Sequence, residues 1–328
     1  MRYVNVDLIL GNEFTFKPIS NLDRYGFSYI LAHKVGLKKP RRPFCVWVHG
    51  WSWWDEILES EDIVGPRAIP RGTSIIVASA SQKIALDRSG YNKTTIGGLP
   101  FAYIDPQNID RNQHAMLAFI AHSAEAEKFD VIDRVYLDYL ESVKNNFDSI
   151  YVSVFALDHS DNLSKEICRR GLKLLRGANP ADKMSLIRTR RMLEYFKYVS
   201  TNTMGSHVAY ALSVACCVSV FSPLHKYDSS ALLGTVHGFD KRYAERMEYI
   251  YSEIYAKNKF PSLFNDNPLL GYSDEALGLT MIGAAYRLNV NNIIDVLGWR
   301  MPDQLNGYMN GAIRRSFRLI NSLGTVSK

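Results

Sequence analysis

The stretch that decides the fold reads YVSTNTMGSH over Tyr198–His207 and continues into the apolar run Val208–Ala215 and the segment Val218–Pro223. This order indicates a strand, a turn rich in hydroxyls and glycine, a helix and a second strand. The turn would present backbone N–H groups, three hydroxyls and the positive end of a helix dipole to one point. It therefore predicts an anion-binding site. The alternative is an ordinary capped helix start, because Ser, Thr and Asn are also preferred capping residues.

The chain around this stretch alternates strands and helices. Apolar or β-branched runs predict strands at Ala115–Ala121, Ser149–Phe155, Leu172–Leu175, Tyr198 and Val218–Phe221. Helical spacing and capping residues predict helices at Val131–Asn145, Leu163–Arg170, Asp182–Lys197 and after Ser206. Strands that are apolar on both faces and alternate strictly with helices indicate an α/β fold with a parallel, doubly wound sheet.

Polar residues gather where these predicted strands end. Right-handed crossovers place the carboxyl ends of parallel strands on one edge of a sheet. The residues expected along that edge are His122, Ser123, Asp158–Ser160, Arg176, Gly177, Thr201, Asn202, Thr203, Gly205, Ser206 and His207. A hydroxyl-rich helix start, an arginine and several histidines in one crevice predict a pocket for nucleotide phosphates. Each residue alone also fits a capping or structural role.

The first hundred residues predict a second α/β unit. It has a strand at Phe44–Val48 that ends in His49 and Gly50, a strand at Thr73–Ala78 and a helix near Ser81–Ser89. The segment from Thr94 to Phe101 is expected to lead outward from this unit.

The polar, turn-forming segment Ile104–Arg111 follows and is the candidate interdomain hinge. We therefore expect one domain over 1–108, a second over 109–305, and a helix over 306–328 that packs back on the first. Two such units predict a cleft between domains, where ligands bind.

Length and composition fit a folded two-domain protein. The chain has 328 residues, 47% of them hydrophobic, and its four cysteines show no CxxC spacing, which fits a reducing cytoplasm. The N-terminus has no signal-like apolar run, and the run Val208–Phe221 is shorter than the ~18–20 residues that span a bilayer. Neither secretion nor membrane insertion is expected.

The net charge of +6 is concentrated in three places: Lys38–Arg42, the segment from Arg169 to Arg191, and Arg314 with Arg315 and Arg318. Solvated faces explain most such clusters, but a basic surface also suits nucleotide phosphates or anionic lipid headgroups. Nucleic acid is not expected as a partner, because no recognition motif accompanies the charge.

The layout resembles the GT-B glycosyltransferases, specifically the bacterial surface-polysaccharide enzymes. Three segments carry the resemblance: Val46–Trp51, Gly97–Phe101 and, above all, Ser200–His207. The resemblance implies two Rossmann-like domains facing a cleft, a nucleotide-sugar donor on the C-terminal domain and a glycan or lipid-linked glycan acceptor on the N-terminal one. The implied activity is sugar transfer to an O-antigen, capsule or lipooligosaccharide. It also implies a cytoplasmic protein with peripheral contact to the anionic inner face of the inner membrane.

Two departures from the better-known patterns refine this expectation. The run from Ser206 to Cys217 lacks the carboxylate with which many retaining enzymes hold the donor's ribose, and so looks more like enzymes that use CMP-activated acidic sugars, such as sialyltransferases. No Asp-x-Asp sequence occurs, which disfavours a metal-dependent GT-A enzyme. We therefore expect an inverting, metal-independent transfer with no cofactor, in which helix-start N–H groups and basic side chains neutralise the departing phosphate.

An inverting transfer needs a base for the proton of the acceptor hydroxyl. His49 is the first candidate because it ends a strand that faces the expected cleft, and Asp55 and Glu56 are the carboxylate alternatives. A purely structural role for His49 is the competing interpretation. At least one of the three tryptophans at positions 51, 53 and 54 is expected to lie against a sugar, or else at the domain interface.

Two other functions stay open. The segment Val48–Trp51 also looks like the oxyanion loop of α/β-hydrolases, but those enzymes need a Gly-x-Ser-x-Gly elbow, which this sequence lacks. A non-catalytic nucleotide-binding protein would keep the Ser200–His207 pocket and need no base.

Overall fold

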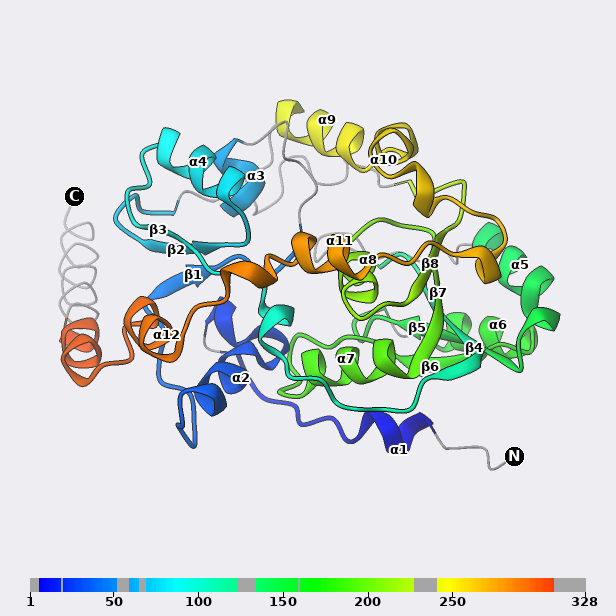
Figure 1. The fold of residues 1–328 in the computed structure, drawn as a ribbon, viewed down its shortest axis with the longest axis horizontal. Helices are drawn as coiled ribbons and strands as arrows, with labels where there is room; N and C mark the ends of the chain where they lie inside the picture. Colours follow the sequence, from blue (N-terminus) through cyan, green and yellow to red (C-terminus); the bar gives the residue numbers. More distant parts are fainter. Residues whose placement is uncertain are drawn as a thin grey trace, which may run out of the picture.

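The computed structural model describes residues 6–18, 20–51, 59–64, 69–122, 134–158, 160–226 and 241–309. Two parallel sheets form its centre, with helices packed around each (Figure 1). The α/β class and the parallel arrangement predicted from the sequence are confirmed.

The smaller sheet belongs to the first unit and contains three strands in the order β1-β2-β3. Its strands are β1 (Cys45–Trp47), β2 (Ser74–Val77) and β3 (Thr94–Ile96), with α3 (Ser60–Val64) between the first two and α4 (Ala80–Arg88) between the last two. The sequence predicted β1, β2 and α4. It missed β3, because a three-residue strand is too short for an alternating pattern to show.

The larger sheet has the order β6-β5-β4-β7-β8, and every neighbouring pair is parallel. Its strands are β4 (Asn112–Phe119), β5 (Ser149–Val154), β6 (Lys173–Arg176), β7 (Phe196–Thr201) and β8 (Cys217–Val220). The connecting helices are α5 (Arg134–Val143) with η3 (Lys144–Asn146), α6 (Asp161–Arg169), α7 (Ser185–Tyr195) and α8 (Ser206–Leu212). Within this sheet, the chain enters at the central strand β4 and adds β5 and β6 on one side. It then crosses back and adds β7 and β8 on the other side of β4. This is the doubly wound topology predicted from the alternation.

Both faces of the strands are buried, which explains their continuous apolar runs. In β4, Ala115 and Leu117 pack into the main core, whereas Met116 and Ala118 belong to a second core under α5 and α6. The main core also contains Trp47 and Ile76 of the smaller sheet. One hydrophobic core therefore joins the two sheets.

The two ends of the described chain each pack on the other unit. The N-terminal segment, which carries α1 (Val6–Leu10), runs along the larger sheet's α7 side, where the Phe14 N–H donates to Asp182 at 2.8 Å and the Phe16 N–H donates to the Ala181 carbonyl at 2.8 Å. The chain then enters η1 (Asn21–Gly26) and α2 (Phe27–Lys34), and the Phe27 ring meets Trp47 of β1 edge-on at 4.9 Å.

The sequence predicted that Asp182 caps α7, and this prediction is wrong. The helix begins at Ser185, and the buried Asp182 carboxylate instead accepts from the backbone of Phe14 and Met184 and pairs with Arg188 at 3.3 Å. The Asp182 carboxylate therefore holds the N-terminal segment against the start of α7.

The C-terminal segment crosses back to the smaller sheet. It contains α9 (Lys241–Ile250), α10 (Glu253–Lys259), η5 (Pro261–Leu263), η6 (Pro268–Leu270), α11 (Glu275–Met281), η7 (Ala284–Tyr286), α12 (Val290–Leu297) and a helix over 301–309. The Ile282 carbonyl accepts from the Leu99 N–H at 2.8 Å, and the Leu297 carbonyl accepts from the Phe44 N–H at 3.2 Å. The return to the first unit thus occurs near Ile282, ahead of Asn306. Of the helix expected over 306–328, residues 310–328 lie outside the described part.

The segment predicted as a hinge is held at several points. Glu194 of α7 accepts from the Gln107 N–H at 2.9 Å, and Arg190 donates to the Ile104 carbonyl at 3.0 Å. Arg111 donates to the carbonyls of Val214 and Ala215 just after α8. These contacts bind the connection to the larger sheet along most of its length.

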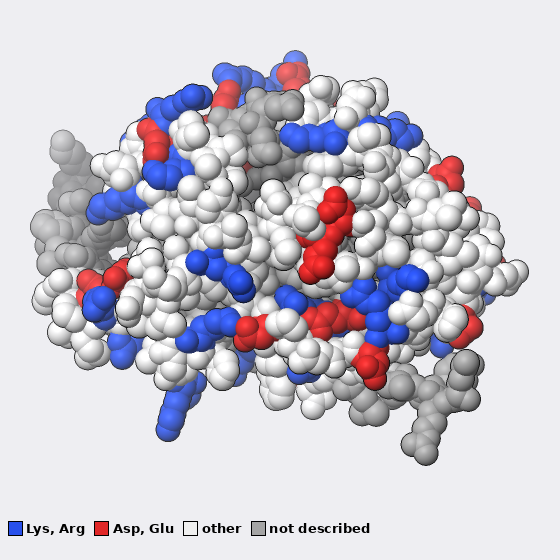
Figure 2. All heavy atoms as spheres, viewed as in Figure 1, with Lys and Arg blue, Asp and Glu red and all other residues white. Residues whose placement is uncertain are grey.

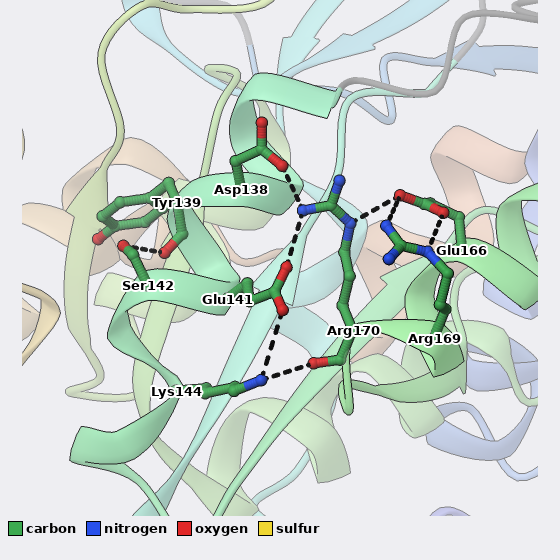
Figure 3. Close-up of polar contacts among 8 residues, drawn as sticks. All are labelled: Asp138, Tyr139, Glu141, Ser142, Lys144, Glu166, Arg169 and Arg170. Atoms are coloured by element: carbon green, nitrogen blue, oxygen red, sulfur yellow. Dashed lines mark hydrogen bonds and ion pairs between the residues drawn. The ribbon is translucent and has the colours of Figure 1, made fainter.

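A network of charges joins α5, α6 and the turn after α6 (Figure 3). Arg170, only 6% exposed, pairs with Asp138, with Glu141 at 3.1 Å and with Glu166 at 2.8 Å. Hydrogen bonds from Arg169, and then from Arg170, lower the pKa of Glu166 to about 2. The network holds the two helices that cover one face of the larger sheet.

Candidate functional site

The candidate site lies at the carboxyl edge of the larger sheet, between β4 and β7. The strand order reverses there, because the chain leaves β4 in one direction and returns to its other side as β7. In open α/β sheets, ligands bind outside the carboxyl ends of the strands at such a switch point. The residues that follow β4 and β7 were the ones singled out from the sequence.

The side chains of the turn after β7 are largely engaged within the protein. Thr201 and Asn202 are fully buried and Thr203 is 4% exposed. The Thr201 hydroxyl donates to the Thr203 carbonyl at 3.1 Å, and the Asn202 carboxamide accepts from the Ala121 N–H at 3.0 Å. Asn202 thereby ties the end of β4 to the end of β7 across the switch point.

The expectation of three hydroxyls meeting at the surface therefore does not hold. Ser200 is also buried, and its hydroxyl accepts from Tyr136 at 3.0 Å. The part of the turn that is only half-buried is Gly205, Ser206 and His207.

The loop after β1 lies directly on this half-buried part of the turn. The Trp51 N–H donates to the Ser206 hydroxyl at 2.8 Å, and a Cβ on Gly50 would lie 3.7 Å from the same oxygen. The His49 carbonyl accepts from the Tyr210 hydroxyl at 3.2 Å. The structure thus brings His49 and Ser206, predicted from opposite halves of the chain, into one site.

Tyr210 of α8 holds the loop after β1 in place through its hydrogen bond to the His49 carbonyl. Its ring is buried and stacks on Phe101 of the first unit at 4.2 Å with an interplanar angle of 6°. Burial raises its pKa, so its hydroxyl remains a hydrogen-bond donor at neutral pH. Tyr210 could not be singled out from the sequence, because a tyrosine within an apolar helix looks like an ordinary core residue.

His207 is the most perturbed titratable group of the site. Its Nε2 lies 2.9 Å from the Thr201 hydroxyl, and its ring packs 4.9 Å from the ring of Phe119 at the end of β4. Burial and then the nearby charge of His122 lower the pKa of His207 to about 3, against a smaller opposing effect of the Thr203 carbonyl. His207 is therefore neutral at physiological pH.

We expect His207 to make stability depend on pH. The unfolded chain protonates this histidine below its ordinary pKa of about 6.5, whereas the folded protein does so only near 3. The unfolded state binds more protons between these values, so the free energy of unfolding falls as the pH falls through that window. In urea unfolding at a series of pH values, His207→Gln should remove a slope of at most about 1.4 kcal/mol per pH unit. The exposed His114→Gln is the control, and parallel curves for wild type and His207→Gln would contradict the assignment.

The other predicted residues after β4 are only partly described. His122 is exposed, and its ring lies 4.9 Å from Phe155 beyond the end of β5. Ser123 lies outside the described residues, as do the candidate carboxylates Asp55 and Glu56 and the tryptophans Trp53 and Trp54. Trp51 is half-buried, with its ring 5.8 Å from Phe260.

Arg176 and Gly177 are not brought to this site. They follow β6, the edge strand, which lies three inter-strand spacings of about 4.8 Å from β7. Arg176 pairs with Glu13 of the N-terminal segment at 2.8 Å. A Cβ on Gly177 would lie 2.6 Å from the Val154 carbonyl, so this glycine serves close packing of β5 and β6. They lie on the carboxyl edge of the sheet, as predicted, but three strands away from the turn, because a strand-end position does not reveal the strand's place in the sheet.

Within the described residues, no group of three or more His, Cys, Asp or Glu side chains is placed to hold a metal ion. The same part of the chain contains no helix long and apolar enough to cross a membrane.

Comparison with known proteins leaves the family open. No family model and no curated protein matches this sequence. Among solved structures, an S. aureus TarM variant in complex with fondaparinux, alpha-GlcNAc-glycerol and UDP gives a TM-score of 0.30 at 14% identity, and a second TarM structure gives 0.28 at 16%. Each alignment covers 72% of this chain and 43% of the TarM chain. At these TM-scores the likeness carries no argument about fold or function.

Proposed function

We propose that the protein is a glycosyltransferase that moves a sugar from a nucleotide-activated donor to a growing surface glycan. The observation that carries the proposal is the contact between the turn at the switch point and the His49–Trp51 loop of the other sheet. A group-transfer enzyme needs two substrates side by side, and here two parallel sheets meet with their strand-end loops in contact. The arrangement fits a GT-B-like enzyme, in which one unit binds the donor and the other unit binds the acceptor.

The donor side is the switch point of the larger sheet. We propose that the nucleotide's phosphate lies over Gly205, Ser206 and His207, the half-buried part of the turn. The backbone N–H groups there would stabilise the charge on the departing phosphate. We favour a CMP-sugar over a UDP-sugar, because the run from Ser206 to Cys217 offers no carboxylate for ribose hydroxyls.

The acceptor side is the loop after β1. An inverting transfer forms a bond between the acceptor oxygen and the anomeric carbon while the bond from that carbon to the phosphate oxygen breaks. The acceptor's proton passes to a base, and the electron pair of the broken bond leaves with the nucleotide. We propose that the His49 imidazole is this base, because its backbone is fixed against Tyr210 beside the donor turn.

A ligand screen tests the donor assignment. CMP, UDP, GDP and ADP are compared by thermal shift, since a ligand at 100 times its Kd stabilises the native state by about 2.7 kcal/mol. The proposal expects CMP to give the largest shift. A larger shift with UDP would replace the proposed donor and keep the enzyme class, and no shift with any of the four would contradict a nucleotide site.

Ser206→Ala is expected to weaken nucleotide binding by about 1–3 kcal/mol, the range for a lost charge-assisted hydrogen bond to phosphate. The substitution also removes the acceptor of the Trp51 N–H, so the unliganded protein should melt at a slightly lower temperature. Isothermal titration with the best ligand of the screen measures the first effect. Ser142→Ala, on the exposed side of α5, is the matched control. Equal affinity of Ser206→Ala and wild type would exclude this hydroxyl from the donor site.

A further inference from the structure

The backbone of Tyr25, in the N-terminal segment, is strained. Within η1, Arg24 has φ −55° and ψ 138°, and Tyr25 has φ 60° and ψ 14°. These angles are close to those of the two central residues of a type II turn, whose second position needs a positive φ and therefore favours glycine or asparagine. A bulky side chain in this left-handed conformation costs free energy. In the described part of the chain, the other non-glycine residues with a positive φ are Asn108 and Ala215.

Contacts with the second unit hold Tyr25 in this conformation. Its N–H donates to the Pro180 carbonyl at 3.0 Å, in the loop between β6 and α7. Gly26 follows with φ 80°, and a Cβ on it would lie 1.8 Å from the Lys183 carbonyl oxygen. The chain therefore passes this loop too closely for any residue but glycine at position 26. Strained backbone persists only where the surrounding structure fixes it in this way, and it concentrates at functional sites.

The ring of Tyr25 lies beside the candidate site. Its centroid is 6.1 Å from that of the His49 imidazole, with an interplanar angle of 41°, a separation at which aromatic rings interact. Burial, and less strongly the charge of the nearby Tyr25 phenol, raise the pKa of Tyr210, against an opposing hydrogen bond from Ser206. Tyr25 thus reaches the contact between the turn after β7 and the loop after β1, although it comes from a third segment of the chain.

Charge singles out no comparable feature on the face drawn in Figure 2. Lys and Arg side chains are interspersed there with Asp and Glu in a band below the centre of the view, where α7 lies in Figure 1. Arg190 and Glu194 of α7, whose side chains approach to 2.6 Å, are one such pair. A surface that attracts a charged ligand is lined by one sign of charge. The mixed band therefore indicates ion pairs between elements.

We propose that Tyr25 is a positioning residue, whose ring holds the His49 imidazole where it can take the proton of the acceptor hydroxyl. The inference rests on the proposed function, in which His49 is the base. Tyr210 donates to the backbone carbonyl of His49, and Tyr25 lies beside its ring, so the two tyrosines fix the histidine at different points. A misplacement of about 1 Å can remove most of a catalytic group's effect. The left-handed backbone sets the direction of the Tyr25 side chain, so the strain serves to aim the ring.

Core packing is the competing explanation, because the Tyr25 ring also packs against the main hydrophobic core. Relief of the strain separates the two, since asparagine tolerates the left-handed conformation but has no ring. Under the proposal, Tyr25→Asn lowers kcat of transfer by about 10- to 100-fold and leaves the KM of the nucleotide donor unchanged. It should melt within about 3 °C of wild type, because relief of strain offsets the lost packing. Tyr25→Phe keeps the ring and should transfer at nearly the wild-type rate.

A double variant tests whether Tyr25 acts through His49. The effects of residues that act as a unit are not additive. Adding Tyr25→Asn to His49→Gln should therefore cause no further loss of transfer. A further loss of about tenfold or more would show that Tyr25 acts on its own and would overturn the proposal, as would a wild-type rate for Tyr25→Asn alone.

Proton NMR of the histidine rings tests the contact without an activity assay. The chain has eight histidines, and the His49 resonance is the one that His49→Gln lacks. An aromatic ring shifts the resonances of protons beside it, so Tyr25→Asn should move the His49 resonance and Tyr25→Phe should leave it nearly in place. An unmoved resonance in Tyr25→Asn would overturn the proposal. If the wild type transfers no sugar, the proposed function fails, and the same spectra still decide whether the Tyr25 ring holds His49.

Two controls match these substitutions. Ala215→Gly relieves the same backbone conformation, with φ 58°, just beyond the end of α8. Tyr29→Asn removes another half-buried tyrosine of the N-terminal segment, whose ring packs edge-on against Phe16 at 5.4 Å. Both controls should transfer at the wild-type rate and leave the His49 resonance in place. An equal loss of transfer in Tyr29→Asn and Tyr25→Asn would overturn the proposal, because the loss would then follow from a loosened segment.

Discussion

Replacing His49 by Gln is expected to lower the rate of sugar transfer by about 10²- to 10⁴-fold, the usual contribution of a positioned base. Nucleotide affinity should stay close to that of wild type, because the donor turn belongs to the other sheet. The contact that holds the loop should also persist, since Tyr210 donates to the backbone carbonyl of His49 and not to its ring. The measurement is a steady-state transfer assay together with a nucleotide titration on the same preparation.

Variants of the other candidate bases and of a control histidine show whether the loss of transfer is specific to His49. Asp55→Asn and Glu56→Gln are assayed beside His49→Gln, because either carboxylate could take the proton or orient the imidazole. His33→Gln, on the exposed face of α2, is the control and should transfer at the wild-type rate. If His49→Gln transfers at that rate as well, the histidine is structural and the base lies elsewhere. His122 is then the next candidate, because the low pKa of His207 makes it a weak proton acceptor.

The larger sheet could be predicted because its sequence signal is local. Strands β4, β5, β7 and β8 contribute buried side chains on both faces, so each can be recognised from its own apolar residues without knowledge of its neighbours in the sheet. The turn after β7 was located for the same reason, since strand, glycine and helix follow one another directly.

The parts that escaped prediction depend on contacts between distant residues. Arg176 looked like a phosphate ligand, but its partner is Glu13, 163 residues away. Asn202 looked like a capping residue, but its carboxamide accepts from Ala121 on the other side of the switch point. The N-terminal segment was assigned to the first unit by continuity, whereas Asp182 holds it against the second. The sequence predicts which helix, strand or turn a residue belongs to, but it does not predict which distant residues it contacts.

The close approach of α11 to α8 makes Gly278 a position where a single methyl group should be strongly destabilising at neutral pH. A Cβ on Gly278 would lie 2.1 Å from the Ser213 nitrogen and 2.4 Å from the Leu212 carbonyl carbon, both backbone atoms that cannot rotate away. Gly278→Ala therefore forces the two helices apart, and we expect the free energy of unfolding to fall by about 3 kcal/mol, the upper part of the range for overpacked cores.

Gly72→Ala is the matched control, because a Cβ there meets no atom within 4 Å and the backbone needs no left-handed conformation. It should change stability by less than about 1 kcal/mol, in the stabilising direction through a less flexible unfolded chain. Urea unfolding followed by circular dichroism measures both variants. A shift of α8 would also move Ser206 relative to the Trp51 N–H, so Gly278→Ala should weaken nucleotide binding even where the protein is still folded. Identical unfolding curves for Gly278→Ala and Gly72→Ala would show that α11 does not pack on α8 in solution.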